Sequence, residues 1–182
     1  MAAARRVLVL GGQRSGKSAH AEALVLASGL APVYLATAAA GDREMAERIA
    51  LHRSRRGEGW RTVEEPLDLA SAIARESDAG YHVLVDCLTI WVSNLVLANR
   101  SVDDEASRLV AALAETGGPV VLVSGEVGLG VVPGDPLSRR FADALGMLNQ
   151  RVAAAVDRVV LIAAGLPLVL KSEQPNSEAI EI

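Results

Sequence analysis

An eight-residue stretch near the start of the chain has the residue types and spacing of a loop that binds nucleotide phosphates. Residues 11–18 read GGQRSGKS, preceded by an apolar run at 7–10 that predicts a buried strand and followed by a segment typical of a helix. In that context the backbone N–H groups and the start of the helix point toward an anion. The alternative is a glycine turn with a solvated lysine. The predicted nucleotide contacts are Gly11, Gly12, Gln13, Arg14, Ser15, Gly16, Lys17 and Ser18.

Three side chains, two in this stretch and one further along the chain, suit the chemistry of a magnesium-bound triphosphate. A lysine placed like Lys17 reaches the β- and γ-phosphates, and a hydroxyl placed like that of Ser18 binds Mg²⁺. Asp86 follows the apolar run 83–85, as expected of the acidic residue that completes such a magnesium site. Aspartate is also common in turns after strands, but beside a phosphate loop the metal interpretation is the stronger one. The predicted metal ligands are Ser18 and Asp86.

A basic segment over 43–56 contains five arginines and His52 in a chain whose net charge is −4. A solvated helix face and an anion-binding surface are both open interpretations of this segment. A neutral imidazole can attack phosphorus and split a nucleotidyl transfer into two steps. From the residues alone, however, a plain surface histidine is the better interpretation of His52.

Length and composition favour a single globular domain. The chain has 182 residues, of which 51% are hydrophobic and 22% charged, which is an ordinary globular balance. The net charge gives no reason to expect binding to nucleic acid or to an anionic membrane. The single cysteine, Cys87, fits a reducing compartment, and no apolar segment at the start is long enough for a signal peptide or membrane span. We expect a cytoplasmic protein with one catalytic domain over 1–171 and a disordered tail over 172–182.

The elements that position these residues alternate between strands and helices. Short apolar strands separated by helical segments predict an α/β fold of the P-loop NTPase type, with three layers, a mostly parallel sheet and an antiparallel edge strand. Residues 125–134 are rich in glycine and apolar residues, which indicates a flap or a packed turn. The predicted strands are 7–10, 33–37, 60–64, 81–87, 119–124, 158–163 and the edge strand 167–170, and the predicted helices are 19–24 and beyond, 42–56, 67–76, 88–98, 102–115 and 136–156.

Several sequence blocks together resemble one enzyme family. The phosphate loop is shared by many families, but RIALH at 48–52, EVGLGVVP at 126–133 and the asparagine–glutamine pair at 149–150 are far more specific. YLAT at 34–37, WRTVE at 60–64 and DCLTIWVSNL at 86–95 add to the match. From about Arg6 to Lys171 the chain resembles the bifunctional adenosylcobinamide kinase/adenosylcobinamide-phosphate guanylyltransferases of cobalamin biosynthesis.

The resemblance implies two reactions and a set of site residues. A nucleoside triphosphate, ATP or GTP, phosphorylates adenosylcobinamide, and GTP then donates GMP to that phosphate. The resemblance makes His52 the residue that carries GMP covalently, beside Lys17 as the other catalytic residue, and it implies a homotrimer. The resemblance also implies further nucleotide contacts at the positions that match the family's motifs, which are Thr37, Ala38, Ala39, Arg53, Ser54, Arg55, Arg56, Glu64 and Asp86.

One departure and two other functions remain to be weighed. Relatives usually carry asparagine before the EVG block, whereas this chain has Gly125. The first alternative function is a P-loop small-molecule kinase without guanylyl transfer. The second is a nucleotide switch without catalysis, which the sequence disfavours because it has none of the further guanine-reading motifs of signalling GTPases.

Overall fold

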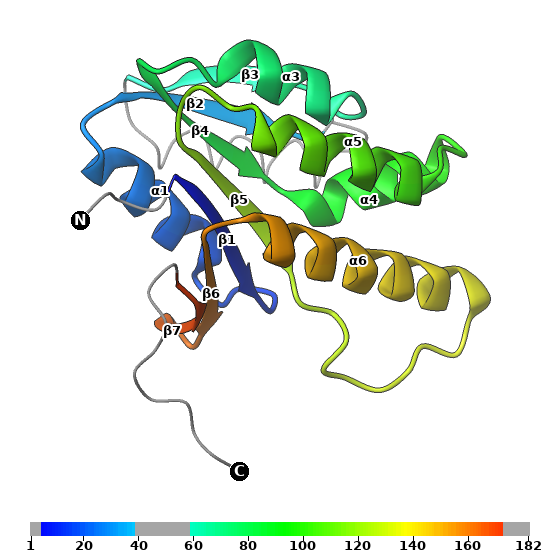
Figure 1. Ribbon diagram of the computed structural model, residues 1–182. Helices are drawn as coiled ribbons and strands as arrows, with labels where there is room; N and C mark the ends of the chain where they lie inside the picture. The colour runs from blue at the N-terminus through cyan, green and yellow to red at the C-terminus, as the bar shows by residue number, and fades with distance from the viewer. Residues whose placement is uncertain (1–4, 39–58, 173–182) are drawn as a thin grey trace.

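A single seven-stranded sheet organises the residues that the computed structural model describes, 5–38 and 59–172 (Figure 1). Its spatial order is β3-β2-β4-β5-β1-β6-β7, and every neighbouring pair is parallel except β6 and β7. This confirms the predicted mostly parallel sheet with an antiparallel edge strand. The strands are β1 Arg6–Gly11, β2 Ala31–Ala36, β3 Arg61–Glu64, β4 Tyr81–Asp86, β5 Val120–Gly125, β6 Arg158–Ala163 and β7 Leu166–Lys171.

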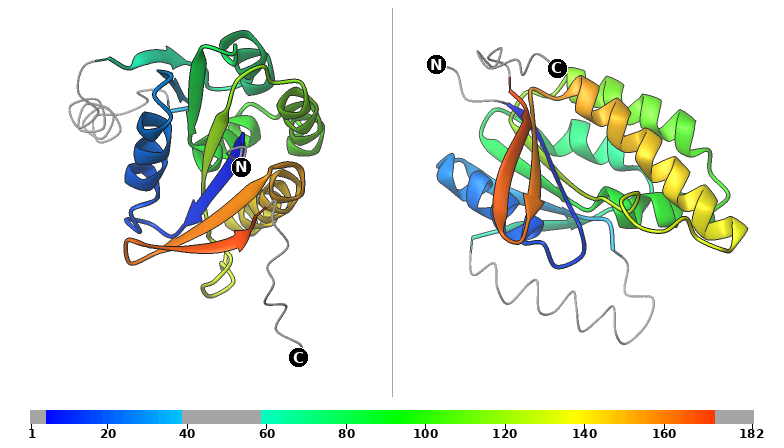
Figure 2. Two further views of the ribbon diagram at one scale, coloured as in Figure 1. Left: turned by 60° about the vertical axis from the view of Figure 1, so that its left-hand side comes forward. Right: turned by 90° about the horizontal axis from the view of Figure 1, so that it is seen from below.

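Helices cover both faces of the sheet, which gives the predicted three layers (Figure 2). Because successive strand residues point to opposite faces, Val9 packs with Val25 on one face, while Leu8 packs with Trp91 on the other. Strands buried on both faces need continuous apolar sequence, and β1 and β5 have it. The helix α1 Lys17–Ala27 forms one outer layer, and α3 Leu69–Glu76, α4 Leu88–Leu97, α5 Val102–Ala114 and α6 Pro136–Ala155 form the other.

The parallel strands bring the ends of β1, β2, β4 and β5 to one edge. Gly11 is in register with Gly125, and Ala36 with Asp86. Ligands bind at the carboxyl edge in open α/β sheets, so the sequence-predicted site residues that follow these strands meet where a ligand is expected.

Polar side chains hold both ends of the longest helix, α6. The Asp135 carboxylate caps the start of α6 by accepting a hydrogen bond from the Ser138 N–H at 2.8 Å. At the other end, Lys171 Nζ donates to the carbonyls of Ala153 and Ala154, each at 2.9 Å, and to that of Val156. A cation there also complements the negative end of the helix.

Part of the prediction falls outside the described residues. The helix predicted over 42–56 and residues 173–182 of the predicted tail lie there. Within the described ranges no helix has the length and apolarity that crossing a membrane requires.

Candidate nucleotide-binding site

The segment 12–16 joins β1 to α1 as the sequence predicts and turns sharply between them. Gly16 is the residue before the helix and has φ of 100°, a left-handed conformation that favours glycine. Lys17 opens the helix, and its Nζ donates to the Gly12 carbonyl at 3.2 Å. The lysine ammonium therefore folds back over the loop, where a phosphate would replace the carbonyl as its partner.

Gly11 sits where no side chain has room. A Cβ there would collide with Ser15 Oγ and lie 2.7 Å from the Ile162 carbonyl oxygen. The loop is held from the β6–β7 turn as well, because the Gly165 N–H donates to the Ser15 carbonyl at 2.9 Å. The buried Ser15 hydroxyl has no hydrogen-bond partner within the described residues, which leaves it available to a ligand.

Asp86 ends β4 on the face of the sheet that α1 covers. The Tyr34 hydroxyl donates to Asp86 Oδ2 at 3.1 Å and orients the carboxylate. Burial raises the pKa of the neighbouring Cys87 thiol to about 11; the Asp86 carboxylate adds to the rise and the Lys17 ammonium opposes it. The charges of Lys17 and Asp86 therefore both act on the Cys87 thiol at the end of β4. With its pKa raised, that thiol stays neutral and serves as a packing residue.

Thr37, a predicted nucleotide contact, has its side chain between the ends of two strands. It follows β2 and is fully buried, and its hydroxyl donates to the Cys87 carbonyl at 2.8 Å and accepts from the Cys87 N–H at 2.9 Å. Asn94 Nδ2 donates to the carbonyls of Thr37 and Pro66, at 2.8 and 3.1 Å. The Thr37 side chain therefore joins the ends of β2 and β4, and Asn94 is a supporting residue that sequence reasoning missed. Its signals were an amide among the mostly apolar residues of 88–97 and its place in the block at 86–95 that carries the family resemblance.

The departure at Gly125 has a physical explanation. The Gly125 N–H donates to Thr89 Oγ1 at 2.6 Å, and its carbonyl accepts from Asn149 Nδ2 at 3.1 Å. A Cβ at position 125 would lie 2.8 Å from Thr89 Oγ1. An asparagine here would require Thr89 to move, so Gly125 and Thr89 fit one another in this chain.

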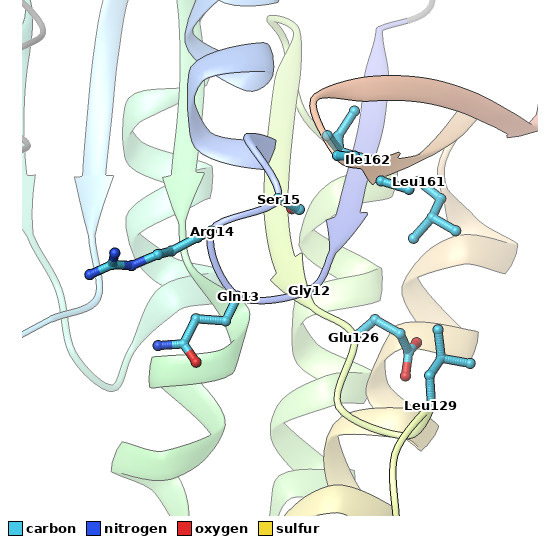
Figure 3. Close-up of a pocket in the computed structure, with 10 residues that line it drawn as sticks. Gly12, Gln13, Arg14, Ser15, Glu126, Leu129, Leu161 and Ile162 are labelled. Atoms are coloured by element: carbon cyan, nitrogen blue, oxygen red, sulfur yellow. The ribbon is translucent and has the colours of Figure 1, made fainter.

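A pocket of about 410 Å³ lies beside the phosphate loop, on the side of β6 (Figure 3). In the close-up, the side chains of Gln13 and Arg14 extend away from Glu126 and Leu129, which lie on the opposite side of Gly12. Leu129 is exposed, so this residue of the loop over 125–134 does not pack against the described part of the chain. The lining residues are Gly12, Gln13, Arg14, Ser15, Glu126, Leu129 and 161–164.

Of the predicted site residues, the described ranges include the phosphate loop, Thr37, Ala38, Glu64 and Asp86. Glu64 ends β3 and is in register with Ala36, so β2 lies between it and Asp86. The others lie outside the described residues, and their roles stay predictions: Ala39, His52, Arg53, Ser54, Arg55 and Arg56.

Two solved structures have a fold similar to that of this chain. The chain superposes on the flagellar accessory protein FlaH of Methanocaldococcus jannaschii with a TM-score of 0.51 and 11% identity, covering 92% of this chain and 78% of that one. The RadB recombinase gives a TM-score of 0.50 at 18% identity, with 86% and 73% covered. At these identities the likeness concerns the fold alone, which is that of the P-loop NTPases.

Sequence comparison defines the family within that class. The family described as cobinamide kinase / cobinamide phosphate guanyltransferase matches residues 7–170. The bifunctional adenosylcobalamin biosynthesis protein CobP of Pseudomonas aeruginosa is 52% identical over 170 residues, which are 92% of this chain and 98% of that protein. The protein CobU of Salmonella typhimurium, described in the same words, is 41% identical over 182 residues, or 91% and 99%. The chain belongs to this family.

Proposed function

We propose that this enzyme phosphorylates adenosylcobinamide with ATP or GTP and then transfers GMP from GTP to adenosylcobinamide phosphate. The product is adenosylcobinamide-GDP. The observation that carries the proposal is the family match over nearly the whole chain, 7–170. The phosphate-loop motif and an acidic residue at the end of β4 support a nucleotide as the donor in both steps.

The phosphorylation step uses the phosphate loop. Its N–H groups and Lys17 hold the β- and γ-phosphates. The acceptor's hydroxyl oxygen bonds to the γ-phosphorus while the bond from that phosphorus to the β–γ bridging oxygen breaks, the nucleoside diphosphate leaves and the hydroxyl proton is released to solvent. The Ser18 hydroxyl and the Asp86 carboxylate are oxygen donors of the kind that Mg²⁺ prefers, and Tyr34 already orients that carboxylate. When bound, Mg²⁺ neutralises the charge that develops on the phosphate oxygens.

The guanylyl transfer step uses His52, a role that the family resemblance supplies. The imidazole nitrogen bonds to the α-phosphorus of GTP and pyrophosphate leaves. The phosphate of the acceptor then attacks the same phosphorus and releases the histidine. Because the attacked atom differs from that of the first step, GTP and His52 must be brought together in a second arrangement. The family resemblance also supplies further proposed nucleotide contacts, which are Thr37, Ala38, Ala39, Arg53, Ser54, Arg55, Arg56 and Glu64.

Intact-protein mass spectrometry after incubation with GTP and Mg²⁺ tests the covalent step. We expect a GMP-sized adduct on the wild type and on a His20→Ala control, because His20 lies on α1 outside the proposed chemistry. His52→Ala protein is expected to carry no adduct and to keep phosphorylating adenosylcobinamide. An adduct on His52→Ala contradicts the assignment of the histidine. If the wild type phosphorylates adenosylcobinamide but carries no adduct, the result favours the alternative function, a kinase without guanylyl transfer.

We also propose that the enzyme works in the cytoplasm as a homotrimer. The trimer comes from the family resemblance. The exposed leucines of β7 support an interface between copies, because apolar side chains on an edge strand are costly to leave in water.

A further inference from the structure

The loop over 126–135, between β5 and α6, is fastened at both ends. At its start the Glu126 N–H donates to the Gly11 carbonyl at 3.1 Å, which ties the loop directly to the strand before the phosphate loop. At its far end Arg139 Nη1 donates to the Pro133 carbonyl at 3.0 Å. The loop is thus held beside the phosphate loop at its start and at the beginning of α6 at its end, and Figure 1 shows it extending between them below α6.

That middle section presents large apolar side chains to solvent. The exposed fractions are 85% for Leu129, 97% for Val131 and 76% for Val132. Apolar side chains scattered singly over a surface are ordinary, but three within four positions of a fastened loop indicate a surface that binds something. None of the three side chains has a hydrogen-bonding group, so they suit an aliphatic partner surface and not the polar edge of a nucleobase.

The same loop forms a wall of the pocket beside the phosphate loop. Leu129 and Glu126 line the pocket together with Gly12 and Ser15 (Figure 3). A ligand lying on the exposed part of the loop can therefore extend one group toward the phosphates of a bound nucleotide. This is the spatial relation that a phosphoryl acceptor requires.

We propose that Leu129, Val131 and Val132 bind the corrin macrocycle of the acceptor, and that its hydroxyl-bearing arm enters the pocket beside Glu126. This inference rests on the proposed function. The corrin ring is broad and carries many methyl groups, whereas a pocket of about 410 Å³ is of a size for a much smaller molecule. The ring therefore stays outside the pocket, on the loop, and only the arm enters. Glu126 supplies a hydrogen-bond acceptor for the arm's hydroxyl.

The test is equilibrium binding of cobinamide, followed by its absorbance, to the full chain saturated with a non-hydrolysable ATP analogue. The variant is Leu129→Ser/Val131→Ser/Val132→Ser, and Leu97→Ser, at a position 75% exposed on α4, is the matched control. Removing this much apolar contact is expected to raise the Kd for cobinamide about tenfold or more. The Kd for the nucleotide analogue and the melting temperature stay at wild-type values, because the three side chains are exposed. The control leaves all three quantities unchanged.

Three results would overturn the inference. If the triple variant and the wild type bind cobinamide with equal affinity, the loop is not part of the acceptor site, and the proposed function is unaffected. A triple variant with unchanged cobinamide affinity but a smaller assembly mass by light scattering assigns the surface to a second copy of the chain. A wild type that binds no cobinamide at all removes both the inference and the proposed function.

Discussion

Glu76 shows how single residues hold the edge of the sheet to its covering helix. The side chain is buried near the end of α3, and both Arg75 and Arg61 bind its carboxylate. Burial alone raises the pKa of Glu76, but the hydrogen bonds from Arg75 and Arg61 outweigh it and hold the pKa below its ordinary value of 4.5. Because Arg61 belongs to β3, this ion pair links β3 to α3.

Replacing Glu76 is expected to weaken the fold in a pH-dependent way. A carboxyl whose pKa is lowered by folding stabilises the protein above its unfolded pKa, and this contribution is lost as pH falls through the lower folded value. We expect Glu76→Gln to reduce the free energy of unfolding by about 1 kcal/mol at pH 7, since both arginines are half exposed and screened by solvent. The difference from wild type should shrink below pH 4.5. Urea unfolding at several pH values measures it, with the exposed Glu115→Gln as control; a difference that persists at low pH contradicts the role of the charge.

Residue-level prediction from sequence succeeds where partners lie close along the chain. The strand and helix around the phosphate loop were predictable because the motif is one contiguous segment. Asn94 and Thr89 were not, because their partners Pro66 and Gly125 lie 28 and 36 positions away. Thr37 was noticed for its place at a strand end, but only the packing of β2 against β4 shows that its hydroxyl is used between them.

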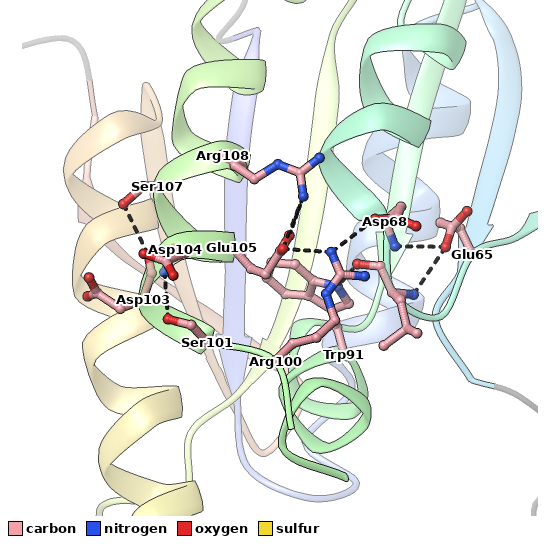
Figure 4. Close-up of polar contacts among 11 residues, drawn as sticks. Glu65, Asp68, Trp91, Arg100, Ser101, Asp103, Asp104, Glu105, Ser107 and Arg108 are labelled. Atoms are coloured by element: carbon pink, nitrogen blue, oxygen red, sulfur yellow. Dashed lines mark hydrogen bonds and ion pairs between the residues drawn. The ribbon is translucent and has the colours of Figure 1, made fainter. Parts of the chain in front are cut away.

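At the scale of elements, α3 and α5 are joined by a cluster of charged and capping residues (Figure 4). Arg100 Nη2 donates to Asp68 Oδ1 before α3 at 3.0 Å and to Glu105 Oε1 of α5 at 2.6 Å. Ser101 caps α5, since its Oγ accepts a hydrogen bond from the Asp104 N–H at 3.2 Å. Three acidic residues in the first turn of α5 complement the positive end of the helix.

The cap at Ser101 gives a prediction with a control on the same helix. Ser101→Ala leaves an N–H group at the helix start without its partner, so the free energy of unfolding should fall by about 1 kcal/mol. Ser107→Ala removes a hydroxyl within α5 that donates to the Asp103 carbonyl at 3.0 Å and accepts a long hydrogen bond, 3.3 Å, from the exposed Arg151 Nη1. That control should change stability by less than half as much. Equal effects of the two substitutions in urea unfolding would remove the capping explanation.

Element boundaries were predictable to within a few residues, and side-chain contacts account for the remainder. The helix predicted from residue 67 begins at Leu69, because the Glu65 carboxylate accepts the N–H groups of Leu67 and Asp68 and holds them in a turn. The strand predicted to end at Thr37 ends at Ala36. Periodicity gives the existence and type of an element, whereas its ends depend on local polar contacts that periodicity does not encode.

At the scale of the whole molecule, the β7 edge of the sheet is exposed and apolar. β7 pairs with β6 alone among the described strands, and its sequence LPLVLK is almost entirely exposed. Leu166, Leu168 and Leu170 alternate along it, with exposed fractions of 72%, 56% and 55%. Alternation places Leu166 and Leu168 on one face of the sheet, and the irregularity in the pairing with β6 at Val159 and Val160 falls beside Leu170. An unpaired apolar edge of this kind favours burial against another chain.

The homotrimer can therefore be tested at β7. We expect the wild type to have the mass of three chains by light scattering, and Leu168→Lys/Leu170→Lys to be smaller, because buried ammonium groups would oppose association. Both positions are more than half exposed in the single chain, so the melting temperature of the separated chain should remain well defined. Met147→Lys, at a position 57% exposed on α6, is the matched control and should leave the mass unchanged. A wild type with the mass of one chain rejects the trimer. A double variant that keeps the trimer mass places the interface elsewhere, and the leucines of β7 then need another partner.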